Sequence, residues 1–310
     1  SRDHGSVSSE LTRRILFGVI AGPIVVGILL VGDAALAGLI AIASALAAWE
    51  FYRIARAGGL DPLDNAGIVI AGLIPLVVHA RYLGLYNPDR TPGPASLVAL
   101  VLVGLFTAVI WLRGVDGKPL GAVAATALGA AYTGGLLSFG YAIRNHEYAF
   151  APATLRLGSW TPTVPSGGLL VLLPVLLTWA SDIGAFTVGR AMGRRKLIPA
   201  VSPGKTVEGA IGGLVACMLL AWVYAQFVLR PAAHLGFRWS PFGALAFGAL
   251  ASVAAQLGDL TESLMKREGG VKDSSHLIPG HGGVLDRLDS LFFVLPVSYV
   301  ALSAMLRYAP

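Results

Sequence analysis

Four aspartates lie within or beside apolar segments in the second half of the chain: Asp182, Asp259, Asp286 and Asp289. A carboxylate inside a bilayer costs about 2.5 kcal/mol or more unless it is paired or solvated. Hard divalent ions such as Mg²⁺ take oxygen ligands, commonly a few carboxylates together with substrate phosphates. The pattern therefore predicts a metal site whose ligands are Asp259, Asp286 and Asp289, with Asp182 as a weaker fourth candidate.

The spacing of Asp286 and Asp289 predicts that both carboxylates lie on one face of a helix, about one turn apart. Two like charges so close together favour the binding of a cation. The alternative is that Asp286 caps the helix while Asp289 pairs with Arg287 or Lys266. For an isolated carboxylate such as Asp182, the alternative to metal binding is that the side chain snorkels to water or pairs with a neighbouring Arg.

The stretch from Glu268 to Gly283 is long, polar and rich in glycine. Glycine lets backbone N–H groups approach an anion closely, and the start of the following helix offers further donors. We therefore interpret this stretch as a phosphate-binding loop. The alternative is a flexible connector in which His276 and His281 are merely solvated.

A second polar stretch, from Arg190 to Gly209, is strongly basic and contains Gly204-Lys-Thr. We exclude a Walker A loop, because Pro199 takes the place of the first glycine that this motif requires and no strand is expected before it. Basic loops beside a membrane are usually topology determinants that touch anionic lipid. Because this loop faces the acidic positions across a membrane edge, it also suits an enzyme that holds several phosphates.

Hydrophobic spans must position these residues. Of the 310 residues, 55% are hydrophobic and only 13% are charged, against roughly 25% charged residues in soluble domains. A bilayer core about 30 Å thick needs roughly 20 helical residues. Nine runs of suitable length predict an all-α, polytopic integral membrane protein: residues 15 to 32, 34 to 52, 66 to 83, 95 to 112, 119 to 143, 167 to 189, 207 to 229, 241 to 265 and 287 to 307.

The order of these spans predicts three regions. Residues 1–14 form a cytoplasmic segment, residues 15–165 hold spans one to five and an outward loop from Arg144 to Gly168, and residues 166–310 hold spans six to nine with the catalytic loops. We expect the first apolar run to be a retained span rather than a signal peptide. Two small-xxx-small pairs, Gly134 with Ser138 and Gly209 with Gly213, predict close helix packing.

The distribution of basic residues predicts the orientation and the partners. With a cytoplasmic amino terminus, 16 of the 23 Lys and Arg residues fall on the cytoplasmic side and 7 on the other side, as the positive-inside rule requires. The net charge of +6 lies between spans rather than along one helix face. This favours anionic headgroups or phosphates over nucleic acid. The single cysteine, Cys217, excludes a disulfide framework and a four-thiolate metal site.

The run from Ser263 to Asp289 resembles the signature of the phosphatidate cytidylyltransferases, also called CDP-diacylglycerol synthases. It combines a Ser-x-x-Lys-Arg opening, Lys272-Asp273, and a His-Gly-Gly-x-x-Asp-Arg-x-Asp close that begins at His281. Two upstream segments, Ser181-Asp-x-Gly-Ala and Ser202-Pro-x-Lys-Thr-x-Glu-Gly, also resemble this family. The resemblance covers roughly residues 179 to 290.

The resemblance implies an EC 2.7.7 nucleotidyltransferase of phospholipid biosynthesis. Its reaction converts CTP and phosphatidate (phosphatidic acid) to CDP-diacylglycerol and pyrophosphate with Mg²⁺, and leaves open a second, monovalent cation. The enzyme is expected to be a homodimer in the cytoplasmic membrane, with the active site facing the cytoplasm. The expected partners are CTP, phosphatidate and membrane lipid, with no nucleic acid.

We assign residue roles on this basis. The catalytic candidates are Asp259, Asp286, Asp289, Lys205 and Lys272. The substrate-binding candidates are Ser202, Lys205, Arg190, Lys266, Arg267, Lys272, His281, Gly282, Gly283 and Arg287. Lys205, Lys266, Arg267 and Lys272 would neutralise the triphosphate, whereas Arg190 and Arg287 could instead hold the lipid headgroup. We expect His281 to orient the loop or contact phosphate rather than act as an obligatory base.

Three other functions compete with this assignment. A transporter or channel also places carboxylates in broken helices, but it would show inverted halves with its charges at the midplane. A CDP-alcohol phosphatidyltransferase would carry an Asp-Gly-x-x-Ala-Arg run, which this chain lacks. A cytidylyltransferase for another lipid phosphate, such as an archaeal ether lipid, would differ only in its acceptor.

Overall fold

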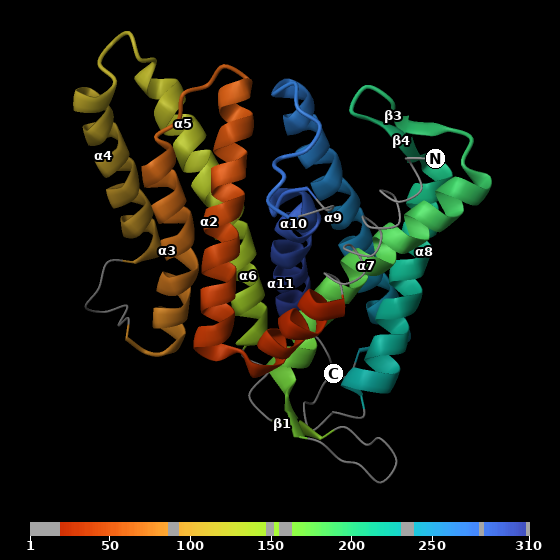
Figure 1. The fold of residues 1–310 in the computed structure, drawn as a ribbon. Helices are drawn as coiled ribbons and strands as arrows, with labels where there is room; N and C mark the ends of the chain where they lie inside the picture. Colours follow the sequence, from red (N-terminus) through yellow and green to blue (C-terminus); the bar gives the residue numbers. More distant parts are fainter. Residues whose placement is uncertain are drawn as a thin grey trace. The chain divides into compact units, whose positions relative to one another are not determined.

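A computed structural model describes residues 19–85, 93–146, 152–154, 163–230, 239–278 and 282–307 (Figure 1). The described part holds eight helices long and apolar enough to cross a membrane: Asp33–Ala57, Asp64–Tyr82, Pro94–Leu112, Pro119–Arg144, Ser166–Met192, Val207–Leu229, Pro241–Glu268 and Leu285–Met305. They confirm eight of the predicted spans and the all-α membrane fold. The first predicted span corresponds to a shorter apolar helix, Val19–Val31, and its residues 15–18 lie outside the described part.

The chain forms two compact units, and each is built from separate stretches of sequence. The large unit comprises residues 1–36, 139–264 and 288–310, and the small unit comprises residues 37–138 and 265–287. The three regions predicted from the order of spans divide the chain by function rather than by compactness. This functional division stays a prediction.

The small unit contains most of the amino-terminal helices. They are α2 (Asp33–Ala57), α3 (Asp64–Tyr82), α4 (Pro94–Leu112) and α5 (Pro119–Ala130), and a π-helical segment, Ala131–Gly135, follows α5. Tyr52 of α2 is fully buried, and its hydroxyl donates to the Thr126 carbonyl at 2.7 Å. A Cβ at Gly134 would lie 2.4 Å from the Ala71 carbonyl oxygen, so only glycine permits this approach to α3. The predicted role of Gly134 in helix packing is confirmed.

The large unit contains the remaining helices and two hairpins. Its helices are α6 (Leu136–Arg144, from residue 139 on), α7 (Ser166–Met192), α8 (Val207–Tyr224, continued by π-helical Ala225–Leu229), α9 (Pro241–Glu268, up to residue 264) and α11 (Leu291–Arg307). Strands β1 (Pro152–Thr154) and β2 (Thr163–Pro165) pair antiparallel, as do β3 (Lys196–Ile198) and β4 (Ser202–Thr206). The sequence predicted loops at both places.

Helices α7 and α8 pack closely through small residues. A Cβ at Gly209 would lie 2.7 Å from the Ala185 carbonyl oxygen, and one at Gly213 would lie 2.8 Å from that of Ser181. These distances confirm the packing role predicted for the Gly209 and Gly213 pair. The close approach brings the carboxyl-terminal half of α7 next to the start of α8, which is where hairpin β3–β4 joins (Figure 1).

The segment with Asp286 and Asp289 differs from the prediction. Asp286 lies in α10 (Leu285–Leu288), a single turn, and α11 begins only at Leu291. Asp289 lies between them, where its Oδ1 accepts a hydrogen bond from the Ser290 backbone N–H at 2.6 Å. The prediction that both carboxylates lie on one face of a continuous helix is therefore wrong, because the helix is interrupted at Asp289 and Ser290.

Candidate active site

A cavity of about 480 Å³ opens in the large unit between α7, hairpin β3–β4, the start of α8 and α9. Its charged lining residues are Asp182 and Arg190 from α7, Lys205 from β4 and Asp259 from α9. Most of the remaining lining is small or apolar, including Ala185, Phe186 and Leu197, and Gln256 adds an uncharged polar side chain. Four residues predicted from the sequence thus line one cavity. The cavity combines charged side chains with apolar walls.

The hairpin that carries Lys205 is anchored to the start of α8. The Glu208 carboxylate accepts hydrogen bonds from the backbone N–H groups of Arg194 at 3.0 Å and Arg195 at 3.2 Å. Thr206 caps α8, because its hydroxyl oxygen accepts from the Gly209 N–H at 3.1 Å. A strand therefore does precede the motif, contrary to the prediction, because β3 ends directly before Pro199. Gly204-Lys-Thr itself lies in strand β4 rather than in a loop, however, so the arrangement is still not a Walker A loop.

Lys205 forms an ion pair across the cavity. Its Nζ lies 2.5 Å from Oδ2 of Asp259, and the two side chains are 25% and 31% exposed. On α9, Gln256 fixes the neighbouring turn, since its amide donates to the Ala210 carbonyl at 3.1 Å and to Ser252 Oγ at 3.0 Å. Both side chains reach the surface in part, whereas the Lys205 ammonium nitrogen itself is buried. An incoming phosphate or cation must therefore open the pair to bind either partner.

A third carboxylate lies near this pair in the large unit. Asp259 and Asp182 both act electrostatically on Asp289, and Lys205 offsets part of their effect. In the described part of the chain, however, no three His, Cys, Asp or Glu side chains gather closely enough to hold a metal ion. The large unit therefore presents clustered negative charge around one ammonium group rather than a preformed metal site.

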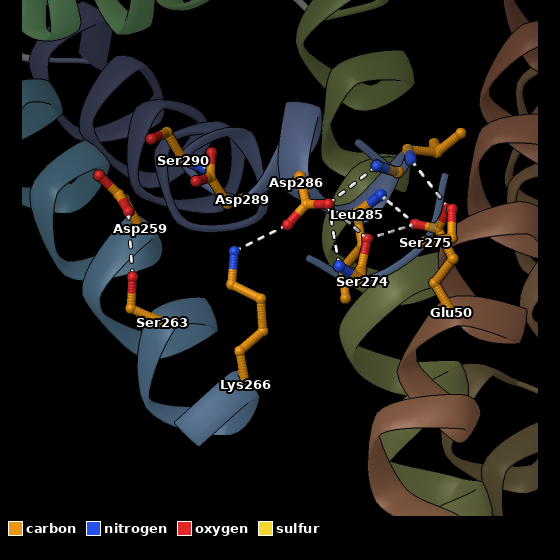
Figure 2. Close-up of polar contacts among 12 residues, drawn as sticks. Glu50, Asp259, Ser263, Lys266, Ser274, Ser275, Leu285, Asp286, Asp289 and Ser290 are labelled. Carbon is orange, nitrogen blue, oxygen red and sulfur yellow. Dashed lines mark hydrogen bonds and ion pairs between the residues drawn. The ribbon is translucent and has the colours of Figure 1, made fainter. Parts of the chain in front are cut away.

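The small unit holds a second ion pair, between Lys266 and Asp286. Lys266 Nζ lies 2.7 Å from Asp286 Oδ1, and both side chains are largely buried, at 15% and 6% exposed. Asp286 Oδ2 also accepts hydrogen bonds from the backbone N–H groups of Ser274 at 3.0 Å and Gly283 at 2.8 Å, and it shares the single hydroxyl proton of Ser274 with Glu50 (Figure 2). This aspartate therefore organises the loop around it as well as pairing with a lysine.

Glu50 is the residue of this network that the sequence analysis missed. It lies in α2, is fully buried, and accepts hydrogen bonds from Ser274, Ser275, Val284 and Leu285 (Figure 2). In the sequence, Glu50 is a single acidic residue near the end of an apolar run, and such a residue usually reaches the membrane surface. The one feature that could have indicated a buried role is its position directly between Trp49 and Phe51, inside a strongly apolar stretch.

Comparison with known proteins decides the family. A family model described as "Cytidylyltransferase family" matches residues 12–305. The chain belongs to the cytidylyltransferase family. This membership confirms the resemblance found in the sequence and the expected class of enzyme, a nucleotidyltransferase, and it excludes the transporter or channel.

Several relatives of the cytidylyltransferase family match nearly the whole chain. The "Phosphatidate cytidylyltransferase" of Synechocystis sp. is 33% identical over 297 residues, which cover 93% of this chain and 95% of the relative. That of Bacillus subtilis is 29% identical over 294 residues, covering 95% and 98%. "Phosphatidate cytidylyltransferase 5, chloroplastic" of Arabidopsis thaliana is 34% identical over 306 residues, covering 94% and 71%.

A cytidylyltransferase must neutralise a triphosphate, and the described residues offer several cations for this. In the large unit, Arg190 lies with its guanidinium carbon 5.9 Å from the centre of the Phe186 ring on the cavity wall. Ser202 lies in β4, opposite Ile198 in the register. In the small unit, the side chains of Arg267, Lys272 and Arg287 are exposed. His281 lies outside the described residues.

The two glycines of the signature have different environments. Gly282 has a φ of +82°, which favours glycine, and its carbonyl accepts from the Ile278 N–H at 2.9 Å. The Gly283 N–H donates to Asp286, as described above, so this donor is engaged within its own loop. Their proposed contact with phosphate stays a prediction.

Proposed function

We propose that this protein is an integral membrane enzyme that makes CDP-diacylglycerol and pyrophosphate from CTP and phosphatidate. The observation that carries the proposal is the cavity in which Lys205 pairs with Asp259, in a chain whose family match spans residues 12–305. The full-length relatives named above carry this activity in their names. The cavity is suited to the reaction because it offers both cationic groups and apolar walls.

The chemistry requires little from a general base. The phosphate of phosphatidate is already anionic near neutral pH, so one of its oxygens attacks the α-phosphorus of CTP directly. A new P–O bond forms, the bond from the α-phosphorus to the bridging oxygen of the β-phosphate breaks, and pyrophosphate leaves with that electron pair. Catalysis is then mostly positioning and neutralisation of charge.

Within the large unit, the two cations of the cavity take separate roles in this proposal. Lys205 neutralises the triphosphate and the departing pyrophosphate, because hairpin β3–β4 holds its ammonium group over the acidic end of the cavity. Arg190 holds the lipid phosphate beside Phe186, an exposed aromatic residue next to which an acyl chain can lie. The acyl chains enter sideways between helices from the inner leaflet.

The proposed cofactor is Mg²⁺. Asp182, Asp259 and Asp289 of the large unit supply the carboxylate oxygens that this ion prefers, but these side chains do not gather closely enough to hold it as they stand. The donor types therefore fit Mg²⁺, and its binding requires the side chains to move closer together. Asp286 is the further ligand predicted from the sequence. A bound Mg²⁺ would supply charge neutralisation at the phosphate oxygens.

Orientation and assembly belong to the same proposal. The excess of basic residues in the loops after spans six and eight supports an active site that faces the cytoplasm, in the cell membrane. The exposed apolar surfaces of α3 and α4 suit contact with lipid, and we propose a homodimer from the family resemblance alone.

Product analysis tests the substrate assignment. Purified enzyme in detergent receives labelled CTP with phosphatidate, with an ether-linked lipid phosphate, or with both, and the lipid product is separated by chromatography. We expect labelled CDP-diacylglycerol and effective competition by phosphatidate. Preferential labelling of the ether lipid would instead support the cytidylyltransferase with a different acceptor.

A further inference from the structure

The carboxylate of Glu50 joins the two ends of the loop formed by residues 274–285. Its Oε1 accepts from the Ser275 hydroxyl at 2.5 Å and from the Val284 N–H at 3.0 Å. Its Oε2 accepts from the Ser274 hydroxyl at 3.0 Å and from the Leu285 N–H at 2.6 Å. Each oxygen therefore binds one hydroxyl from the start of the loop and one backbone N–H from its end.

These bonds lead directly to Asp286. The hydroxyl oxygen of Ser274, which contacts Glu50, also lies 2.8 Å from Asp286 Oδ2. Leu285, whose N–H binds Glu50, is the residue before Asp286. The orientation of the Asp286 side chain is thus set by a loop that closes around Glu50 (Figure 2).

Gly283 packs tightly against this carboxylate. A Cβ on Gly283 would lie 2.5 Å from both carboxylate oxygens of Glu50 and 2.1 Å from Ser274 Oγ. Glu50 itself is fully buried, and a buried carboxylate is tolerated only where hydrogen bonds replace its hydration. Because an apolar side chain would stabilise a helix at lower cost, a buried acid with four loop donors points to a role in shaping the loop.

We propose that Glu50, from the amino-terminal half of the chain, is a positioning residue for cytidylyl transfer, because it holds both ends of the 274–285 loop and thereby fixes the carboxylate of Asp286. This inference rests on the proposed function. Glu50 does not touch substrate in this account, and its effect on the reaction passes through Asp286.

The Glu50→Gln variant separates this role from simple space filling. An amide has the size of the carboxyl group but replaces one acceptor oxygen by an NH₂ donor. Since each oxygen of Glu50 accepts one backbone N–H, the NH₂ group faces a backbone donor whichever way the amide is turned. A hydroxyl can rotate to accept instead, whereas a backbone N–H cannot. Glu50→Asp keeps both acceptor oxygens on a shorter stem and serves as the conservative rescue.

The experiment compares wild type, Glu50→Gln, Glu50→Asp and a matched control, Glu268→Gln. Glu268 is an exposed acid beside the same loop. For each purified protein, kcat and the KM for CTP are expressed per folded molecule, with folding measured by size-exclusion chromatography and thermal unfolding. Hydrogen exchange of the amides in residues 274–285 reports on the loop without depending on turnover.

We expect Glu50→Gln to lower kcat by about 10- to 100-fold with a smaller change in the KM for CTP, and to speed exchange at residues 284 and 285. Glu50→Asp should recover part of the rate, and Glu268→Gln should match wild type. Wild-type kcat in Glu50→Gln, a loss that equals the loss of folded protein, or a lower kcat with unchanged exchange would each overturn the role of Glu50. Absence of turnover in wild type would overturn the proposed function itself.

Discussion

Lys205 and Asp259 form an ion pair that ties hairpin β3–β4 to helix α9 across the cavity of the large unit. The lysine lies in strand β4 of a hairpin anchored by Glu208, and the aspartate lies on a helix that Gln256 ties to α8. The pair therefore joins the hairpin to the helix through side chains that are partly exposed, although the Lys205 ammonium nitrogen is buried. Substrate must open this pair for the two charges to exchange partners, and this exchange is the basis of the first prediction.

Replacement of Lys205 by Met should lower kcat/KM for CTP by about 100-fold, because one charge-assisted contact to phosphate is lost. The long apolar stem is retained, so packing changes little. Steady-state kinetics with varied CTP measure the effect. The matched control is Lys196→Met, in the partner strand of the same hairpin and outside the cavity lining, which should stay within about twofold of wild type. Equal losses in both variants would indicate a general effect of basic charge on the hairpin.

Replacement of Asp289 by Asn should raise the Mg²⁺ concentration required for half-maximal turnover by at least about tenfold, because a carboxylate ligand is replaced by a neutral one. Asp182→Asn should have a smaller effect, as befits the weaker candidate. Turnover measured across a Mg²⁺ titration tests both. Near-normal turnover of Asp289→Asn at limiting Mg²⁺ would show that Asp289 is not a ligand.

Replacement of Gly283 by Ala should destabilise the small unit by roughly 2 kcal/mol, a typical cost of overpacking. The added methyl group would collide with Ser274 and with the Glu50 carboxylate. Gly121→Ala is the matched control, since no atom lies within 4 Å of a Cβ added at this position in α5. Thermal unfolding in detergent compares the two. Similar melting temperatures for both variants would contradict the described packing of the loop.

The orientation can be tested by cysteine labelling. The native thiol, Cys217, is buried, and Cys217→Ser provides a background without thiols. In this background, Arg194→Cys should react with a membrane-impermeant maleimide only after the cells are opened, whereas Leu85→Cys should react in intact cells. Leu85 is 76% exposed in the small unit, and Arg194 is exposed in the large unit. The reverse pattern would place the catalytic loops on the outer side.

The spans could be predicted from the sequence because a bilayer imposes a length and a composition that each segment must satisfy by itself. For the same reason, Asp182, Lys205 and Asp259 were recognisable as exceptions, and the structure places all three at one cavity. The family signature then identified the chemistry that such exceptions serve.

Features that depend on pairing between distant segments could not be predicted in this way. Hairpin β3–β4 has strands of three and five residues, too short for a periodic pattern, and it is held by Glu208 from the next helix. The interruption of the helix at Asp289 and Ser290 has no proline or glycine to mark it. Glu50 is 224 residues from Ser274 in the sequence, so its role becomes visible only once the fold brings them together.

The most direct test of the account is the release of pyrophosphate by the purified, detergent-solubilised protein. The complete reaction contains CTP, phosphatidate and Mg²⁺, and the controls omit phosphatidate, omit Mg²⁺ or replace CTP by ATP. The account predicts rapid release only in the complete reaction. Release without phosphatidate, or none from a folded preparation that binds CTP, would contradict the transfer of a cytidylyl group to this lipid.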